Sequence, residues 1–357
     1  MITATAEINL TALQHNFAQV KQIAPQSKVL AVLKANAYGH GLVPIAEQLK
    51  DADSFGVARI DEALALRAGG IVKPIVLLEG FLHAQDLPIL VANNIQTVVH
   101  IPHQIELILS TKLESPLNVW LKVDTGMHRL GVAPAFFEEA YHWLNQSKNV
   151  HQPMRLMTHF ACADESDNDK TQQQIALFEQ LTSNHVGEKT MANSAAVIAW
   201  PNARADWVRP GLMLYGVSPI SELTAAELHL SPVMTLKSSL IAIRPIKKGE
   251  SVGYGAAWVA QQDTNIGVIA IGYGDGYPRN APSGTPVLIN GRIVLLVGRV
   301  SMDMITIDLG SNPTEQLGDE VVLWGDGLPV EEIARLAETI PYELLCNITQ
   351  RVKCLYL

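Results

Sequence analysis

The sequence predicts an α/β protein with an N-terminal (β/α)8 TIM-type barrel and a C-terminal, mainly β domain. Strand-like and helix-like stretches alternate about eight times between residue 5 and about residue 230. After Ser231-Pro232 the chain changes to short strand-like runs separated by turn residues. At about 150 residues per domain, 357 residues suggest two domains, although a barrel can occupy roughly 250 residues alone. We therefore expect the barrel at residues 1–230 and the β domain at residues 231–357.

The first part of the chain alternates short β-branched runs with amphipathic stretches. The strand-like runs are 28–33, 55–58, 74–78, 97–100, 118–123, 154–158 and 189–192, with a last one between 207 and 215. Between them, apolar residues recur at helical spacing, as at Leu10, Leu13, Phe17 and Val20. Strand and helix repeated in this way favour a closed parallel barrel over an open doubly wound sheet.

The second part predicts a separate β domain with turns of Gly, Asn, Asp and Pro. Its strand-like runs are 234–244, 266–271, 285–289, 293–297, 304–309 and 320–323. A single helical stretch, Val330–Thr339, interrupts them. The strand-like run Ala6–Asn9 precedes the barrel and could pair with this domain.

Composition excludes several classes of function. The chain has 35 Asp and Glu against 26 Lys and Arg, and no basic run with interleaved aromatic residues, so we expect no nucleic-acid partner. The N-terminus lacks a basic start with an apolar stretch, and no run approaches 18 apolar residues, so we expect a cytoplasmic protein that does not enter a membrane. Cys162, Cys346 and Cys354 show no Cys-x-x-Cys spacing and are interpreted as ordinary thiols. No metal site is predicted.

Lys34 closes the first apolar run of the barrel. It is expected at the C-terminal mouth of a strand, where barrels of this kind keep their active sites. A lysine partly removed from water there can form a Schiff base with an aldehyde. The same residue could also be a lysine that merely extends into solvent from the strand end.

The segment around Lys34 reads Val-Leu-Lys-Ala-Asn-Ala-Tyr-Gly-His-Gly and resembles the pyridoxal-phosphate lysine motif of alanine racemases. The other motifs of that family follow in order at 122–131, 158–165, 193–195, 209–212, 253–255, 272–276 and 298–303. The resemblance extends over essentially the whole chain. It implies a barrel and a β domain in a head-to-tail homodimer, which agrees with the organisation described above.

The resemblance also implies a two-base reaction. Inverting an amino acid at Cα removes a proton that is far too weakly acidic at neutral pH, so pyridoxal 5'-phosphate is expected as the carbanion sink. One base is needed on each face of the planar carbanion. In the family, the lysine that matches Lys34 serves the D-alanine side and the tyrosine that matches Tyr254 serves the L-alanine side. Because these residues lie in different domains, the dimer would combine two chains in one site, and a monomer is expected to be inactive. Without the family, Tyr254 would be read as a turn tyrosine at a strand end.

Arg209 is the residue that carries most information about the type of reaction. The resemblance places it against the pyridine nitrogen, where its charge disfavours ring protonation and makes the cofactor a weaker electron sink. In the family, the histidine that matches His159 supports the catalytic tyrosine and touches this arginine. On sequence alone, Arg209 would be a surface or salt-bridging arginine.

Further residues are implied to hold the cofactor phosphate and the substrate. Tyr38, the Ser194 hydroxyl and the amides around Gly211 and Leu212 are expected to hold the phosphate. Ser194 could also cap the helix that follows it. The substrate carboxylate should pair with Arg129 and the Met302 amide, while Tyr273 and Met302 narrow the pocket toward a small side chain. Met302 could otherwise be core filler.

Lys122 matches a lysine that many family members carbamylate, which turns a cation into an anion that orients the arginine matching Arg129. Without that modification the two cations would repel each other, and another group would have to compensate. Gln350 stands where relatives often have a tyrosine that narrows the entrance channel. Three residues match the channel of the family: Asp164, Arg279 and Arg299.

The sequence therefore predicts an alanine racemase that makes D-alanine for peptidoglycan or recovers L-alanine for catabolism. A decarboxylase of the same architecture would act on a basic amino acid, but such relatives carry a cysteine where Tyr254 stands. A non-catalytic pyridoxal-phosphate carrier would need only the barrel, and the whole β domain counts against it.

Overall fold

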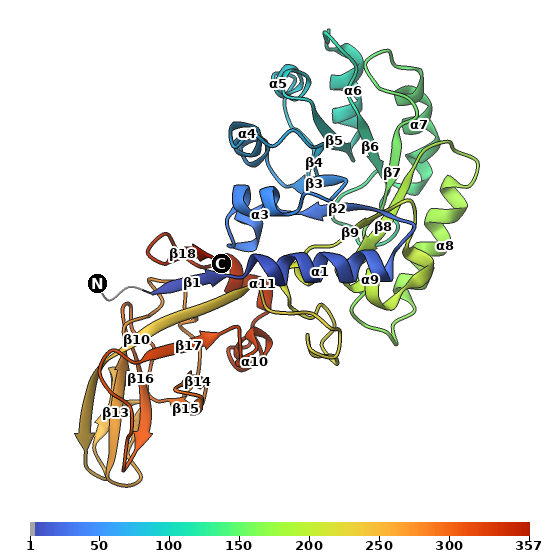
Figure 1. Ribbon diagram of the computed structural model, residues 1–357. Helices are drawn as coiled ribbons and strands as arrows, with labels where there is room; N and C mark the ends of the chain where they lie inside the picture. The colour runs from blue at the N-terminus through green and yellow to red at the C-terminus, as the bar shows by residue number, and fades with distance from the viewer. Residues whose placement is uncertain (1–3) are drawn as a thin grey trace.

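A computed structural model describes residues 4–357, so the first three residues of the predicted barrel domain lie outside the described residues. Eight parallel strands close into a barrel in chain order, which confirms the predicted fold class (Figure 1). The barrel strands are β2 (Lys28–Val32), β3 (Ser54–Val57), β4 (Ile75–Leu77), β5 (Ile95–Val99), β6 (Val119–Lys122), β7 (Arg155–Met157), β8 (Lys189–Asn193) and β9 (Trp207–Arg209). Each of them overlaps one of the predicted strand-like runs.

One helix precedes the first barrel strand and others follow the later strands, and together they cover the outer side of the barrel (Figure 1). They are α1 (Leu10–Ile23), α3 (Leu42–Gln48), α4 (Ile60–Ala68), α5 (Asp86–Ala92), α6 (Pro102–Ser110), α7 (Phe137–Gln146), α8 (Lys170–Thr182) and α9 (Ser194–Ala199), with short 3-10 turns η1 (Pro134–Phe136), η2 (Pro201–Ala203) and η3 (Leu212–Tyr215). Helix α1 begins at the Asn9 side chain, which accepts from the Ala12 amide, and it buries Leu13, Phe17 and Val20 as its spacing predicts.

The β domain is built on one sheet whose strands are far apart in the sequence. Its order is β13-β16-β15-β14-β17-β10-β1-β18. The strands are β1 (Thr5–Ile8), β10 (Met234–Ile246), β13 (Thr264–Ile269), β14 (Pro286–Ile289), β15 (Arg292–Leu296), β16 (Ile305–Gly310), β17 (Glu320–Trp324) and β18 (Lys353–Tyr356). A two-stranded ribbon of β11 (Ser251–Val252) and β12 (Trp258–Val259) flanks the turn η4 (Tyr254–Ala256).

The first strand of the chain belongs to this sheet, as its position before the barrel suggested. Strand β1 pairs antiparallel with β10 and parallel with β18. In addition, the amide of Leu10, the first residue of α1, donates to the carbonyl of Leu357. The N-terminal and C-terminal segments of the chain thus both connect the barrel to the β domain.

Two sequence expectations for the β domain were incomplete. The predicted helix Val330–Thr339 is α10 (Val330–Leu336), and a second helix that was not predicted, α11 (Pro341–Cys346), follows it. Between them Glu338 adopts a left-handed φ of 53°, and Pro341 stands at the first position of α11, where proline is favoured. Strand β18 was not predicted, since only its pairing with the distant β1 defines it.

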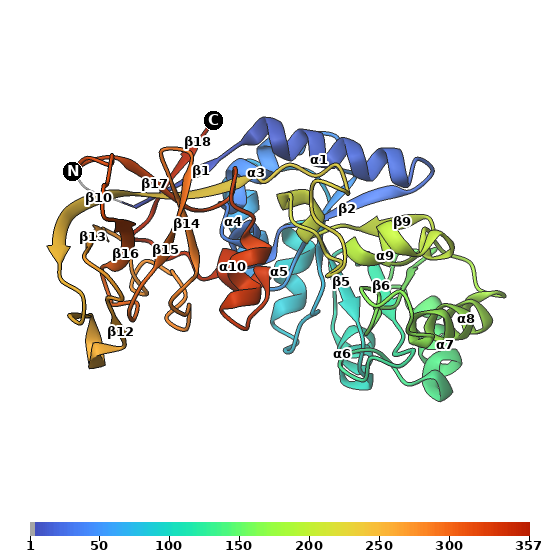
Figure 2. The same cartoon turned by 90° about the horizontal axis from the view of Figure 1, so that it is seen from below.

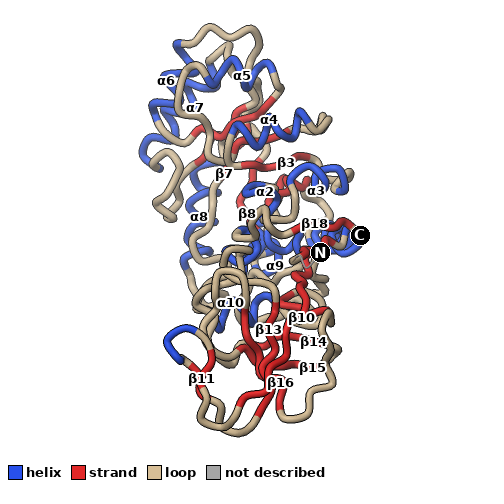
Figure 3. Tube along the Cα trace, turned by 90° about the vertical axis from the view of Figure 1, so that its left-hand side faces the viewer, coloured by secondary structure: helices blue, strands red, loops and turns tan. Residues whose placement is uncertain are grey.

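The long strand β10 extends away from the barrel, and the other strands of the β domain lie beside it (Figure 2). The ribbon that contains β11 lies at the end of the β domain remote from the barrel (Figure 3). No helix within residues 4–357 is long and apolar enough to cross a membrane.

Candidate active site

The predicted barrel residues gather at the carboxyl ends of the strands. Lys34 follows β2 after one residue, Lys122 ends β6 and Arg209 ends β9. His159 follows β7, and Ser194 directly follows β8. This is the face on which barrels of this kind carry active sites.

The chain leaves Lys34 in a left-handed turn. Element α2 (Lys34–Tyr38) has φ of 53°, 55°, 53° and 52° at its last four residues, none of which is glycine. For such residues this conformation costs roughly 1–2 kcal/mol each, so the surrounding structure must hold it. The amide of Ala35 donates to Glu62 of α4 at 2.6 Å, and the Leu42 amide donates to the Asn36 side chain at 2.9 Å.

Tyr38, at the end of this turn, closes a cradle of amides. Its ring is buried and packs against Tyr215 at 4.8 Å between ring centroids. A Cβ at Gly211 would lie 2.6 Å from the Tyr38 hydroxyl oxygen, so only glycine fits there. The amides of Gly211 and Met213 both point at the Ser194 hydroxyl oxygen, at 2.8 and 3.4 Å. Because its oxygen accepts from these amides, the Ser194 hydroxyl keeps its own proton to donate, and together with the Tyr38 hydroxyl beside Gly211 it suits an anion such as a phosphate.

Ser194 does not cap helix α9. The capping residue is Asn193, whose side chain accepts from the Ala196 amide at 3.0 Å, while Ser194 is the first residue of the helix. The Ser194 hydroxyl therefore accepts from the Gly211 and Met213 amides and has no part in capping α9.

Arg209 is buried, not a surface or salt-bridging arginine. Its guanidinium donates to the Thr190 hydroxyl and the Thr158 carbonyl, both at 2.7 Å, and to the Met191 carbonyl at 3.0 Å. Nη2 also lies 3.1 Å from Nδ1 of His159, so this nitrogen accepts and the imidazole proton sits on Nε2. Burial lowers the pKa of Arg209 to about 10, and it remains charged at neutral pH.

Lys122 is a buried cation among other cations. Burial, followed by the charges of Arg209, Arg129 and Lys34, lowers the pKa of Lys122 to about 8. The same causes, burial first and Arg209 second, hold the pKa of His159 well below its usual range. A substantial share of Lys122 is thus a neutral amine near pH 8, which is the nucleophilic form.

Sequence reasoning missed the polar network beneath these residues. The hydroxyls of Thr125 and Thr158 lie 2.7 Å apart, and the Gln174 amide donates to Thr125 at 3.1 Å and to the His159 carbonyl at 3.0 Å. All three side chains are buried. Thr125 and Thr158 lie within the family motifs at 122–131 and 158–165, but nothing local in the sequence indicates that they meet each other.

Tyr273 and Met302 are brought together on the β domain. The Tyr273 amide donates to the Ser301 carbonyl at 3.0 Å, and the Gly274 amide to the Met302 carbonyl at 2.9 Å. Met302 is 52% exposed and Tyr273 40% exposed, so Met302 is not core filler. These two apolar side chains stand free on the surface of the single chain.

The second predicted base is remote from Lys34 within one chain. Tyr254 follows the ribbon strand β11, which lies at the far end of the β domain, and it is 69% exposed (Figure 3). The Arg299 guanidinium packs close to Gly255, beside this tyrosine. Arg279 and Arg299 are exposed on the β domain.

Asp164 and Gln350 lie on opposite domains. Asp164 is exposed on the barrel and lies near Tyr342, where burial and then the Asp164 charge raise the pKa of Tyr342 to about 12. Gln350 is an exposed residue in the turn before β18. Within one chain, the predicted barrel residues therefore lie together, whereas the predicted β-domain residues lie apart from them.

Fold and site define a two-domain barrel protein with a lysine, a buried arginine and an anion cradle at the carboxyl mouth of the barrel. Residues 8–219 match the sequence profile of the family described as "Alanine racemase, N-terminal domain", and residues 233–356 match "Alanine racemase, C-terminal domain". The chain is 60% identical over 356 residues to the alanine racemase of Aeromonas hydrophila subsp. hydrophila, with 99% of each chain covered. It is 58% identical over 356 residues to that of Vibrio cholerae serotype O1, covering 100% of this chain and 99% of the relative.

Solved structures agree with these relatives. The biosynthetic alanine racemase from Pseudomonas aeruginosa matches with a TM-score of 0.97 at 46% identity, with both chains fully covered. The alanine racemase from Acinetobacter baumannii matches with a TM-score of 0.94 at 38% identity, again with both chains fully covered. The chain belongs to the alanine racemase family.

Proposed function

We propose that this protein is an alanine racemase that uses pyridoxal 5'-phosphate and works as a head-to-tail homodimer. The observation that carries the proposal is the left-handed turn after Lys34, which joins this lysine to the amide cradle under Tyr38. The names of the relatives and their match over the whole chain support the same activity.

The residues present fit this cofactor. Lys34 would hold its aldehyde carbon, Arg209 its ring nitrogen, and Tyr38, Ser194 and the amides around Gly211 and Leu212 its phosphate. When bound, the cofactor supplies the electron sink that lets the Cα–H bond of alanine ionise. Because Arg209 bonds only to neutral acceptors among the described residues, no carboxylate partner would offset its charge beside the cofactor ring.

Protons would move at two side chains on opposite faces of the substrate. The Lys34 amine would take and return the proton on the D-alanine side, and Tyr254 of the partner subunit on the L-alanine side. The exposure of Tyr254, Tyr273 and Met302 supports this arrangement, since a dimer would cover these side chains over the partner's barrel. Arg129 would pair with the substrate carboxylate.

Lys122 would carry a carbamate that orients Arg129. The buried, partly neutral amine supports this modification, because carbon dioxide adds only to a neutral amine and the resulting anion would offset the surrounding cations. Intact-protein mass spectrometry at pH 8 with bicarbonate should find one carbamate that is lost at low pH and absent from Lys122→Ala. A free amine in crystallographic density and in mass would refute this step.

The activity is tested by polarimetry with added pyridoxal phosphate. Optical rotation should fall toward zero from L-alanine and from D-alanine at constant amino-acid concentration. Lys34→Ala should abolish turnover and cofactor retention, while Lys148→Ala, an exposed lysine remote from the site, should change neither. Stable rotation with loss of the amino acid would indicate a decarboxylase, and stable rotation with a bound cofactor would indicate a carrier.

The direction of use in the cell is tested separately. A deletion strain that needs D-alanine to grow would show supply of D-alanine for peptidoglycan. A strain that fails only on D-alanine as carbon source would show recovery of L-alanine.

A further inference from the structure

His40 is a buried histidine with an unusual pair of hydrogen-bond partners. Its side chain is fully buried, and Nδ1 lies 2.8 Å from the Tyr38 carbonyl oxygen and 3.0 Å from that of Ala37. Because a carbonyl can only accept, Nδ1 must carry the proton. Nε2 has no partner among the described residues. Burial lowers the pKa of His40 to about 4, so the ring is neutral at neutral pH.

The two carbonyls belong to the left-handed turn that follows Lys34. In that turn the Ala37 carbonyl also accepts from the His40 amide at 3.1 Å. The Tyr38 carbonyl, by contrast, accepts from the His40 side chain. A buried carbonyl without a donor is strongly unfavourable. The imidazole N–H therefore favours this backbone conformation over one that leaves the carbonyls unpaired.

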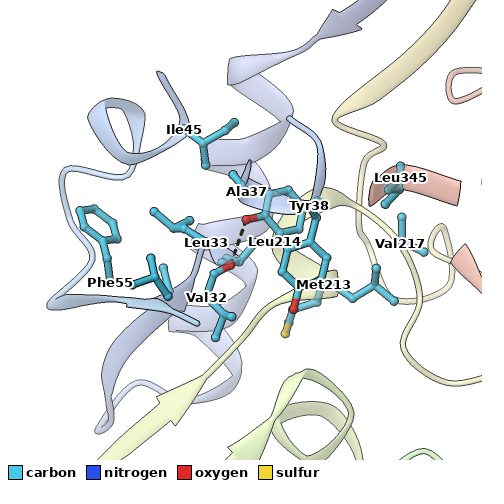
Figure 4. Close-up of a cluster of buried hydrophobic side chains, with 14 of the residues drawn as sticks. Val32, Leu33, Ala37, Tyr38, Ile45, Phe55, Met213, Leu214, Val217 and Leu345 are labelled. Carbon is cyan, nitrogen blue, oxygen red and sulfur yellow. Dashed lines mark hydrogen bonds between the residues drawn. The ribbon is translucent and has the colours of Figure 1, made fainter. Parts of the chain in front are cut away.

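The ring of His40 is itself fixed by an aromatic cluster. It stacks on Tyr215 at 4.6 Å between centroids, with 28° between the planes. The hydroxyl of Tyr215 donates to the Val32 carbonyl at 2.9 Å, and its ring packs against Tyr38. Figure 4 shows Val32 and Tyr38 in one cluster of buried side chains. The imidazole thus links the end of strand β2, which precedes Lys34, to the far end of the turn.

We propose that His40 is a positioning residue that holds the left-handed turn and thereby sets Lys34 and Tyr38 for cofactor binding. It touches neither substrate nor cofactor in this role and acts through one donor, the Nδ1 hydrogen. The proposal rests on the proposed function, since it assumes that Lys34 and Tyr38 hold pyridoxal phosphate.

The test compares side chains that place a donor differently. In His40→Asn the amide nitrogen occupies the topological place of Nδ1, in His40→Gln it lies one bond further out, and His40→Phe has no donor. The control is Asn149→Ala, because buried Asn149 likewise donates to two backbone carbonyls, those of Ile108 and Thr111 at 2.7 and 2.8 Å, far from the site. Binding of pyridoxal phosphate to the cofactor-free full-length protein is titrated by absorbance, and thermal unfolding is recorded for each variant.

We expect His40→Asn to bind pyridoxal phosphate within about threefold of wild type, and His40→Gln and His40→Phe to bind it at least about tenfold more weakly. Asn149→Ala should lose thermal stability but keep its cofactor affinity. At saturating cofactor, KM for alanine should change little in all four variants, because Arg129 is not held by the turn.

Two results would overturn the proposal: equal cofactor affinity in His40→Phe and wild type, or an equal loss in His40→Asn and His40→Gln. If His40→Phe does not fold, the comparison of Asn with Gln decides. A wild-type protein that binds no pyridoxal phosphate would instead refute the proposed function.

Discussion

The four residues after Lys34 store backbone strain that a glycine would relieve. Ala35 is exposed and adopts φ 53°, so its methyl group contributes little packing to offset the left-handed conformation. We predict that Ala35→Gly raises the free energy of unfolding by up to about 1 kcal/mol, the relief of strain minus the entropy cost of glycine. Ala65→Gly, at an exposed position in the right-handed helix α4, should lower it by about 1 kcal/mol.

Denaturant unfolding of the two variants measures both values. If Ala35→Gly is as destabilising as Ala65→Gly, the turn is not strained at this residue. The segment resembles a helix because its amides donate to carbonyls four residues earlier, as at Ala37 and Gly39. Its positive φ values give it the opposite handedness.

At the scale of elements, the amino ends of the barrel strands are closed by a charged and aromatic cluster. The Arg155 guanidinium lies between the Trp120 and Trp207 rings, at 5.1 and 5.6 Å from their centroids, and its Nε donates to Glu188 at 2.8 Å. Burial opposes the charge of Glu188, but hydrogen bonds from Lys28, Trp207 and Arg155 outweigh it and lower the pKa of Glu188 to about 2. Because this end of the barrel is opposite the active-site face, the cluster serves stability.

The lowered pKa of Glu188 predicts a pH dependence. Its unfolded value is near 4.5, so the stabilisation is complete above that pH and is lost as the pH falls from about 4.5 toward 2. In denaturant titrations from pH 6 to pH 3, Glu188→Gln should be less stable than wild type by roughly 1–2 kcal/mol at pH 6, since solvent partly screens the carboxylate, and the difference should shrink toward pH 3. A difference that stays constant over this range would contradict the assignment.

The loops that carry Tyr273 and Met302 are clamped by the chain before β18. Nε of Arg351 lies 3.1 Å from Asp275, and its Nη2 donates to Asp303 at 2.7 Å. One guanidinium thus joins both loops from two nitrogen atoms fixed in one plane, whereas a lysine would offer a single, more mobile ammonium group without that geometry.

We predict that Arg351→Lys raises KM for alanine several-fold with a smaller effect on kcat. The reason is that the two loops proposed to narrow the substrate pocket would be held less firmly. Arg292→Lys is the matched control, since Arg292 is also half-exposed and pairs with the buried Glu315 elsewhere in the sheet. Steady-state kinetics on the two variants decide. An unchanged KM in Arg351→Lys would show that backbone hydrogen bonds alone hold the loops.

At the scale of the whole molecule, Lys34 and Tyr254 lie on different domains, and a composite site needs two chains. We predict that mixing Lys34→Ala chains with Tyr254→Phe chains restores activity, because each mixed dimer has one site with both native residues. With random exchange of equal amounts, about a quarter of the wild-type rate is expected, since half of the dimers are mixed and each holds one intact site of two.

To measure this rate, the two variants are mixed, partially unfolded and refolded together, and the racemisation of alanine is then followed. Each variant treated alone provides the background. If the mixture is no more active than the two backgrounds, both residues act within one chain and the head-to-tail arrangement is wrong.

The sequence by itself determined the order and kind of most elements, and it located the residues of the barrel half of the candidate site at strand ends. Hydrophobic periodicity is local, so each barrel strand and helix α1 follow from it, and Lys34, Arg209 and Ser194 occur at strand ends that the same periodicity locates. Only the tertiary structure decided the pairing of β18 with β1 and the left-handed turn. Each of these depends on groups far away in the chain, such as Glu62 for Ala35 and Tyr215 for His40, and no local pattern encodes a contact between distant residues.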